Sequence, residues 1–328
     1  MSLPEKASAA QELGFLDLAA TLKAAGDPLR LEVLRLLARD SFGVMELSRI
    51  FEVKQSGMSH HLKVLANAGL VATRREGNSI FYRRVLPEGE PTREMGWAQA
   101  LFQRLDTTPL SAKVQAQLEL IRAERDQASK QFFADNATKF RAQQDLIASY
   151  PVYAEAVTDL LTSTPLPSLG RALEVGPGEG EFLAQLAPRF EQVVALDNAK
   201  TMLDKAEAFA VNQGLSNIAF VCGDTGLARQ ELEPVDCVVV NMVLHHVPSP
   251  ASIFEDISAL LKPGGALLIC DLCHHDQQWA REACGDQWLG FEPDDFSNWA
   301  QAAQLSEGQS QYMALRNGFR IQLRQFFK

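Results

Sequence analysis

The chain has 328 residues, 46% hydrophobic and 22% charged, a composition typical of a globular protein and a length that accommodates two domains. No apolar run approaches the roughly 18 residues needed to span a bilayer, and the first residues lack an apolar core followed by a cleavage site. We therefore expect no membrane association and a cytoplasmic location. An odd number of cysteines favours reduced thiols over a disulfide framework. They all lie in the C-terminal half: Cys222, Cys237, Cys270, Cys273 and Cys284.

The net charge of −10 is unevenly distributed. Residues 1–86 hold 12 Lys/Arg and 9 Asp/Glu, a net of +3, and residues 87–328 hold 19 and 32, a net of −13. Phosphate repels the acidic remainder, so any contact with nucleic acid must come from a basic face of the first segment.

The first segment contains a helix-turn-helix pattern. Asp27 can cap a helix that starts at Pro28, and Leu29, Val33 and Leu36 then recur at helical spacing. A short helix over about 44–51 precedes a longer one over about 55–68, which Gly69 can end. On the longer helix one face is apolar: Met58, Leu62 and Leu65. The opposite side is polar: Ser56, Ser59, His60, Lys63 and Asn67.

A β-hairpin is expected next. Residues 70–75 and 79–84 alternate around a turn at Glu76-Gly-Asn78, which is typical of two antiparallel strands. Arginines flank this wing and are placed to meet a DNA backbone: Arg74, Arg75, Arg83 and Arg84.

This segment resembles the winged-helix regulators of the arsenic-repressor (ArsR-type) family over about residues 13–86. The resemblance rests on Gln55-Ser-Gly-Met-Ser-His-His-Leu-Lys-Val-Leu65 and Ala68-Gly-Leu-Val71. It implies a homodimer on double-stranded operator DNA. By resemblance, one set of side chains faces base edges: Gln55, Ser56, Ser59 and His60. Another contacts phosphates: Lys63, Arg74 and Arg75. The alternative is a merely solvated polar face. Metal-sensing relatives carry cysteines on the preceding helix, but Gly43-Val-Met-Glu-Leu-Ser-Arg-Ile50 has no Cys or His, so we expect the signal to enter elsewhere.

A helical connector over 106–150 is predicted between a DNA-binding and dimerisation domain at 1–105 and a second domain at 151–328. Pro87-Glu-Gly-Glu-Pro91 breaks the chain, and helices are expected over about 92–105 and 110–149. A nearly heptad stripe, interrupted by Arg125, serves either a dimer seam or docking on one domain, and docking is favoured. Its members are Val114, Leu118, Ile121, Ala128 and Phe132.

The C-terminal segment alternates strands with helices, which predicts a doubly wound, Rossmann-like parallel sheet in an α/β two-domain protein. Strands are expected near 171–175, 193–197, 217–221, 235–240 and 265–271, followed by an antiparallel pair near 309–315 and 319–327. Glu174-Val-Gly-Pro-Gly-Glu-Gly180 follows the first strand, where glycines let the backbone approach a ligand, and a helix is expected from about Glu179. Asp197 ends the second strand, where an acid can hold ribose hydroxyls. Up to this point a dinucleotide site is an equal alternative.

Three later motifs resemble the class I S-adenosylmethionine (SAM) dependent methyltransferases of the type 11-like group, over about residues 130–328. They are Cys222-Gly-Asp224, Asn241-Met-Val-Leu-His-His-Val-Pro-Ser-Pro250 and Leu261-Lys-Pro-Gly-Gly-Ala266. The resemblance implies that SAM or S-adenosylhomocysteine is the cofactor, and it carries over the following residues. Glu174, Gly176 and Gly178 meet the methionine part, Asp197 the ribose, Met202 and Asp224 the adenine, and Asn241 the sulfonium. Asn198 and Thr225 complete the cofactor-binding set. Ala199 stands where the family usually has Ser.

Two histidine-containing stretches are candidates for catalysis or for cofactor attachment. His245 and His246 resemble a structural marker of such methyltransferases, with a general base as the alternative, so catalytic residues stay unknown. Cys270-Asp-Leu-Cys-His274 spells a haem-attachment pattern, but we interpret it as a strand end and site wall and expect no metal. The segment Trp279–Phe291 is either a lid or core.

The sequence thus predicts a DNA-binding transcriptional regulator, a repressor, that binds SAM or S-adenosylhomocysteine in a methyltransferase-type domain. The alternative is an active methyltransferase of a small-molecule acceptor with an autoregulatory DNA-binding domain.

Overall fold

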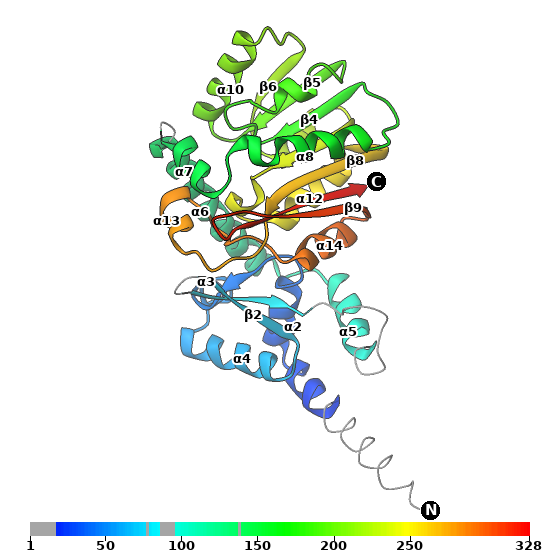
Figure 1. Ribbon diagram of the computed structural model, residues 1–328. Helices are drawn as coiled ribbons and strands as arrows, with labels where there is room; N and C mark the ends of the chain where they lie inside the picture. Colours follow the sequence, from blue (N-terminus) through cyan, green and yellow to red (C-terminus); the bar gives the residue numbers. More distant parts are fainter. Residues whose placement is uncertain (1–17, 77–78, 86–95, 137–138) are drawn as a thin grey trace, which may run out of the picture. The chain divides into compact units, whose positions relative to one another are not determined.

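The computed structural model describes residues 18–76, 79–85, 96–136 and 139–328 (Figure 1). The chain divides into two compact units, residues up to Ala123 and residues from Glu124 onward, and the division falls within the stretch predicted as a connector. The predicted hairpin turn at Gly77-Asn78 and chain break at Pro87–Pro91 lie outside the described residues.

The first unit is a winged helix. Its elements are α2 (Pro28–Leu36), β1 (Phe42–Gly43), α3 (Val44–Ile50), α4 (Gln55–Asn67), β2 (Val71–Glu76), β3 (Ser79–Arg84), α5 (Gly96–Asp106) and the start of α6 (Ala112–Asn136). The three strands form a sheet in the order β1-β3-β2, with antiparallel pairing. This confirms the predicted helix-turn-helix and wing.

Local signals explain where these helices begin and which face they bury. Asp27 accepts a hydrogen bond from the Arg30 backbone N–H at 3.1 Å and so caps α2. On α4, Met58, Leu62 and Leu65 are fully buried in the core of this unit. The burial of these three side chains orients the opposite face of α4 toward solvent.

One of the four arginines predicted to flank the wing and meet DNA, Arg84, is placed differently in the structure. Its side chain is buried, and Nη1 and Nη2 each donate to a carboxylate oxygen of Asp106 at 2.8 Å. The guanidinium also lies 4.4 Å from the ring centre of Phe102 on α5. Arg84 therefore ties the wing to α5 and cannot meet DNA phosphate.

The second unit is a three-layer α/β domain. Its helices are the end of α6, α7 (Phe140–Ile147), α8 (Tyr150–Ser163), α9 (Leu183–Leu186), α10 (Lys200–Asn212), α11 (Thr225–Glu231), η1 (Leu244–His246), α12 (Pro250–Leu260), α13 (Trp279–Cys284) and α14 (Pro293–Ala302). Its strands are β4 (Arg171–Val175), β5 (Gln192–Asp197), β6 (Ile218–Cys222), β7 (Val235–Asn241), β8 (Leu261–Leu272), β9 (Ser306–Ala314) and β10 (Arg320–Phe327).

These strands form one sheet in the order β6-β5-β4-β7-β8-β10-β9. The first five are parallel, and β10 inserts antiparallel between β8 and β9. The predicted doubly wound sheet with an antiparallel final pair is confirmed. The helix expected from about Glu179 is a single turn that begins later, at Leu183.

The helical stretch predicted over 110–149 is two helices, and the first of them belongs to both units. Val114, Leu118 and Ile121 of α6 are buried in the core of the winged helix. Docking, rather than a dimer seam, therefore accounts for this part of the apolar stripe. The Arg122 guanidinium adds an ion pair with Asp40 at 2.6 Å.

Two expectations drawn from composition can be compared with the structure. None of the helices in the described part of the chain is long and apolar enough to cross a membrane. The cysteines are all free thiols: Cys222, Cys237, Cys270, Cys273 and Cys284.

Candidate functional site

The predicted cofactor residues cluster at one edge of the large sheet. Val175 of β4 pairs in parallel with Leu196 of β5 and with Val240 of β7. Since parallel strands end on the same side, the segments that follow β4, β5 and β7 emerge together. This carboxyl edge is where open α/β sheets bind ligands.

Glu174 is a buried carboxyl group at this edge. Its Oε2 has no hydrogen-bond partner among the described residues, and its side chain is almost inaccessible to solvent. Burial raises the pKa of Glu174 to about 8. The group is therefore mostly protonated at neutral pH, and a cationic ligand group beside it would favour ionisation.

The three glycines after β4 are needed for different reasons. Gly176 has φ +65°, and a Cβ there would lie 2.5 Å from Val243 Cγ2. A Cβ on Gly180 would lie 3.0 Å from the Ala206 Cα, so that glycine lets α10 approach closely. Gly178 has φ +57°, yet a Cβ there would meet nothing within 4 Å. The turn is therefore packed on both sides and open at Gly178.

Asp197 ends β5 in a half-buried position. Burial raises its pKa to about 6, although a hydrogen bond from the Ala199 backbone N–H, at 2.8 Å to Oδ1, acts in the opposite direction. Because a backbone group makes this bond, the loss of a hydroxyl at Ala199 leaves Asp197 supported. The neighbouring Asn198 donates from Nδ2 to Asp126 Oδ1 of α6 at 3.2 Å.

The residues predicted around adenine differ in exposure and in whether their polar groups already have hydrogen-bond partners. Met202 is buried on α10. Asp224 is exposed at the end of β6, and its Oδ1 caps α11 by accepting from the Leu227 N–H at 2.8 Å. Thr225 is buried and donates its hydroxyl to Asp256 Oδ2 at 2.8 Å, so that hydroxyl has a structural partner.

Asn241, at the end of β7, is buried, and its side-chain amide lacks hydrogen bonds in the described part of the chain. Neither its Oδ1 nor its Nδ2 has a hydrogen-bond partner among the described residues. The next residue, Met242, has φ +55°, a left-handed conformation that costs a non-glycine residue about 1–3 kcal/mol. A buried free amide and a strained backbone at one turn are typical of a ligand site.

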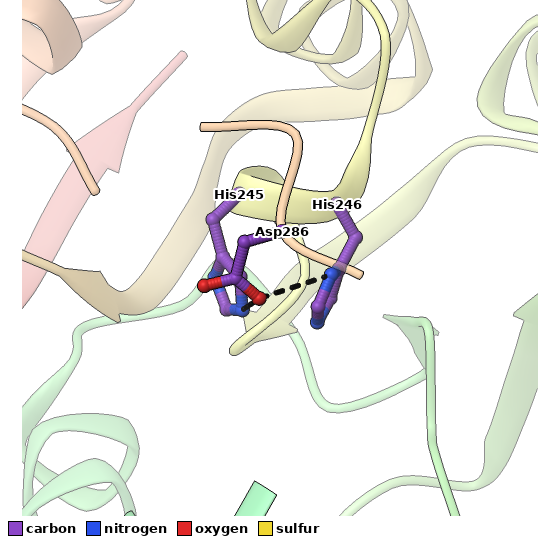
Figure 2. Close-up of side chains that lie close together, drawn as sticks. All are labelled: His245, His246 and Asp286. Carbon is purple, nitrogen blue, oxygen red and sulfur yellow. Dashed lines mark ion pairs between the residues drawn. The ribbon is translucent and has the colours of Figure 1, made fainter. Parts of the chain in front are cut away.

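His245 and His246 are buried on η1, beside two acids that the sequence did not associate with them. His245 Nδ1 donates to Asp271 Oδ1 at 2.7 Å, and Asp286 lies on the other side (Figure 2). Burial lowers the pKa of His245, but the charges of Asp271 and Asp286 and the hydrogen bond to Asp271 raise it to about 8. Burial, followed by the charge of His245, holds the pKa of His246 well below its usual value.

The segment Trp279–Phe291 belongs mostly to the core. Trp288, Leu289 and Phe291 are buried, whereas Trp279 is partly exposed. The burial of these side chains agrees with core packing, and the lid stays a prediction.

The predicted DNA face lies on the solvent side of α4. Its five α4 residues are all exposed: Gln55, Ser56, Ser59, His60 and Lys63. On β2, Arg75 is exposed and Arg74 half-buried. The structure therefore presents polar and basic side chains on the second helix of a helix-turn-helix, the element that enters the major groove in such proteins.

Comparison with known proteins assigns both units. Residues 27–73 match the model of the bacterial regulatory protein, arsR family, and residues 173–269 match the methyltransferase domain model. The chain joins an arsR-family domain to a methyltransferase domain. The cofactor of the second domain is SAM or its product S-adenosylhomocysteine.

Curated relatives match the methyltransferase domain. The tRNA 5-carboxymethoxyuridine methyltransferase of Escherichia coli (strain K12) is 34% identical over 103 residues, 31% of this chain and 40% of the relative. The ubiquinone biosynthesis O-methyltransferase of Xanthomonas axonopodis pv. citri (strain 306) is 30% identical over 147 residues, 45% of this chain and 60% of the relative. The chain thus spans 40% and 60% of these two relatives. A solved structure, the N-methyltransferase NodS from Bradyrhizobium japonicum WM9, aligns with TM-score 0.43 and 17% identity over 58% of this chain and 97% of that one.

Gly178→Val is expected to abolish binding of S-adenosylhomocysteine, because the branched side chain would enter the open space at the turn. Gly214→Val is the matched control: Gly214 follows α10, has φ +68°, and a Cβ there also meets nothing within 4 Å. Both variants carry the same backbone strain. Calorimetry should show binding lost only in Gly178→Val, and equal affinity in the two variants would place the ligand elsewhere.

Binding of S-adenosylhomocysteine is expected to strengthen as pH rises from 6.5 to about 8, because the ligand's ammonium group requires Glu174 to ionise, and the pKa of Glu174 is about 8. The affinity gain approaches tenfold per pH unit and levels off above the pKa. Calorimetry in buffers of different ionisation enthalpy should detect proton release on binding. Glu174→Gln should abolish both the slope and the release, and a slope retained in Glu174→Gln would refute this role.

Proposed function

We propose that the protein is a homodimeric DNA-binding transcriptional repressor that senses SAM or S-adenosylhomocysteine through its methyltransferase domain. DNA binding would place it in the cytoplasm. In this proposal the α4 face and wing contact operator DNA, and the residues at the carboxyl edge of the large sheet hold the nucleoside. The observation that carries the proposal is the continuity of α6, which contributes to both units.

The first part of α6 is built into the winged helix. Val114, Leu118 and Ile121 fill its core, and Arg122 pairs with the buried carboxylate of Asp40. A shift of these residues would disturb the packing beneath α4, because packed interiors transmit small displacements.

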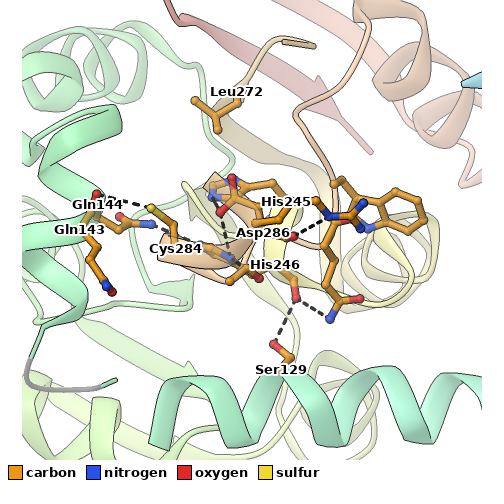
Figure 3. A network of polar contacts seen from close by, with 12 residues as sticks. Ser129, Gln143, Gln144, His245, His246, Leu272, Cys284 and Asp286 are labelled. Carbon is orange, nitrogen blue, oxygen red and sulfur yellow. Dashed lines mark hydrogen bonds and ion pairs between the residues drawn. The ribbon is translucent and has the colours of Figure 1, made fainter. Parts of the chain in front are cut away.

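The second part of α6 contacts the ligand edge at two points. Asp126 accepts the hydrogen bond from Asn198, next to the predicted ribose acid. Ser129 donates to the His246 backbone oxygen at 3.2 Å, after β7 (Figure 3). A nucleoside at the ends of β5 and β7 would therefore bear on residues that hold α6, and it can favour one of two α6 positions.

The DNA face is tested by two variants that act differently. His60→Ala is expected to cost about 1–3 kcal/mol at one half-site position and to relax sequence preference, because it removes a base contact. Arg75→Ala is expected to weaken binding to all sequences and to reduce the salt slope by about one, because it removes a phosphate contact. Arg104→Ala, an exposed arginine on α5, is the charge-matched control. Mobility shifts across salt concentrations measure all three, and wild-type behaviour of His60→Ala and Arg75→Ala would exclude this face.

The sensing function is tested by measuring operator affinity with and without each nucleoside. We expect a change of about 5–150-fold, which corresponds to a coupling of 1–3 kcal/mol. Operator DNA must change the nucleoside affinity by the same factor. If neither nucleoside alters operator affinity by even about twofold, the proposal that the protein senses these nucleosides is wrong.

Asp126→Ala separates coupling from binding. The variant should keep operator and nucleoside affinity but bring the coupling factor close to one, because Asn198 loses its contact with α6. Asp135→Ala is the control on the same helix, since Asp135 accepts only a local hydrogen bond from Gln131 in this region.

A second candidate function is methyl transfer to a small molecule, with the DNA-binding domain serving autoregulation. The relatives matched here are methyltransferases, and the buried amide of Asn241 lies where a methyl donor would sit. Transfer of labelled methyl from SAM to a component of a cell extract, without any effect of nucleosides on operator binding, would favour this function.

A further inference from the structure

Among the described residues, one group of three side chains places metal-ligating atoms within 4.8 Å of one another. The group comprises His245, His246 and Asp286, and all three are buried (Figure 2). Asp286 Oδ1 lies 3.9 Å from His245 Nε2 and 3.6 Å from His246 Nδ1. Tetrahedral ligands that bind one ion at about 2.0–2.2 Å lie roughly 3.3–3.6 Å apart, so the separation from His246 suits a shared ion and that from His245 requires the two side chains to approach by a few tenths of an ångström.

The hydrogen bond to Asp271 prepares His245 as a ligand. A carboxylate can only accept, so Nδ1 carries a proton, and in the neutral ring that binds a metal the Nε2 lone pair points away from Asp271. Nε2 has no hydrogen-bond partner among the described residues and faces Asp286. An acid that orients a histidine in this way is the usual second layer of a metal site.

His246 has a similar support on its far side. Its Nε2 lies 3.2 Å from the side-chain amide of Gln144 on α7 (Figure 3). An amide can present its oxygen as well as its nitrogen, so Gln144 can accept Nε2–H. Nδ1 also lies 3.4 Å from the Gly285 backbone oxygen, and an ion at Nδ1 would replace that long contact. Each imidazole thus has one nitrogen that a neighbouring side chain supports and the other within 4 Å of Asp286 Oδ1.

We propose that His245, His246 and Asp286 form a binding site for one zinc ion. Two imidazole nitrogens and one carboxylate oxygen are a donor set that suits zinc better than magnesium or calcium. The carboxylates of Asp271 and Asp286 also make positive charge favourable at this point. The ion joins η1, after β7, to the segment between α13 and Phe291.

This site differs from the cysteine-rich stretch that follows β8. Cys270, Cys273 and His274 do not form a group of three with ligating atoms close together in the described part of the chain. The test of the proposed zinc site measures metal binding alone, so its outcome does not depend on the sensing function.

The test is zinc binding by the full chain after chelator treatment and removal of the chelator. Competition with a chromophoric chelator is expected to show one ion per chain. Asp286→Asn and His246→Gln should each lower the zinc affinity by at least about tenfold. His274→Gln is the matched control, because His274 lies outside the group of three and its Nδ1 contacts the Leu289 backbone oxygen at 3.1 Å, and it should bind zinc like the wild type.

Two measurements guard against misfolded variants and other ligands. Zinc should raise the melting temperature of the wild type and of His274→Gln but not that of Asp286→Asn. Cobalt bound to the wild type should give ligand-field bands without a thiolate charge-transfer band. Failure to bind an ion stoichiometrically, or a thiolate band that identifies Cys270 or Cys273 as a ligand, would overturn the proposal.

Discussion

The buried carboxylate of Asp271 stabilises the carboxyl edge of the large sheet in the methyltransferase domain. It accepts hydrogen bonds from the backbone N–H groups of Leu244 and Leu272, at 2.8 and 2.7 Å, and from His245 Nδ1 at 2.7 Å. A buried charge is tolerated only when such partners satisfy it. Since these partners come from the turn after β7 and from β8, this one group fixes how the two strands end, and the strained Met242 lies within the turn that it secures.

The contacts of the neighbouring residues extend this arrangement outward. The His245 backbone oxygen accepts from the N–H groups of Gln287 and Trp288, at 2.8 and 3.1 Å, which anchors the segment after α13. The His246 oxygen accepts from Ser129 of α6 and from Gln287 Nε2. Asp271, η1, the Asp286 segment and α6 are therefore one hydrogen-bonded unit, and a ligand at the end of β7 lies next to all of it.

Most of the fold could be predicted from the sequence because its signals are local. A capping Asp27, an apolar face on α4 and a glycine turn after β4 each act within a few residues. The contacts that define the site are long-range and leave no such trace. Asp286 reaches His246 across 40 positions, and nothing in its own neighbourhood marks it as a partner. The predicted contact of Arg84 with DNA is wrong for the same reason. Only the position of α5 in the fold decides that the Arg84 guanidinium pairs with Asp106.

The apolar stripe of α6 shows how a sequence pattern can be correct and still incomplete. Arg125 interrupts the stripe beside the point where the chain passes from one unit to the other, between Ala123 and Glu124. Before that point the apolar residues fill the winged-helix core, and beyond it Phe132 packs so closely on Gly285 that a Cβ there would meet its ring. The stripe thus packs against the winged-helix core in its first part and against the second unit in its last residue. A helix whose halves are fixed by different cores cannot shift at one end without straining the other. A coupling of about 1–3 kcal/mol is no larger than one hydrogen bond to a charged group. The contact between Asn198 and Asp126 is such a bond, so a single well-placed contact is enough in energy to carry a signal along α6.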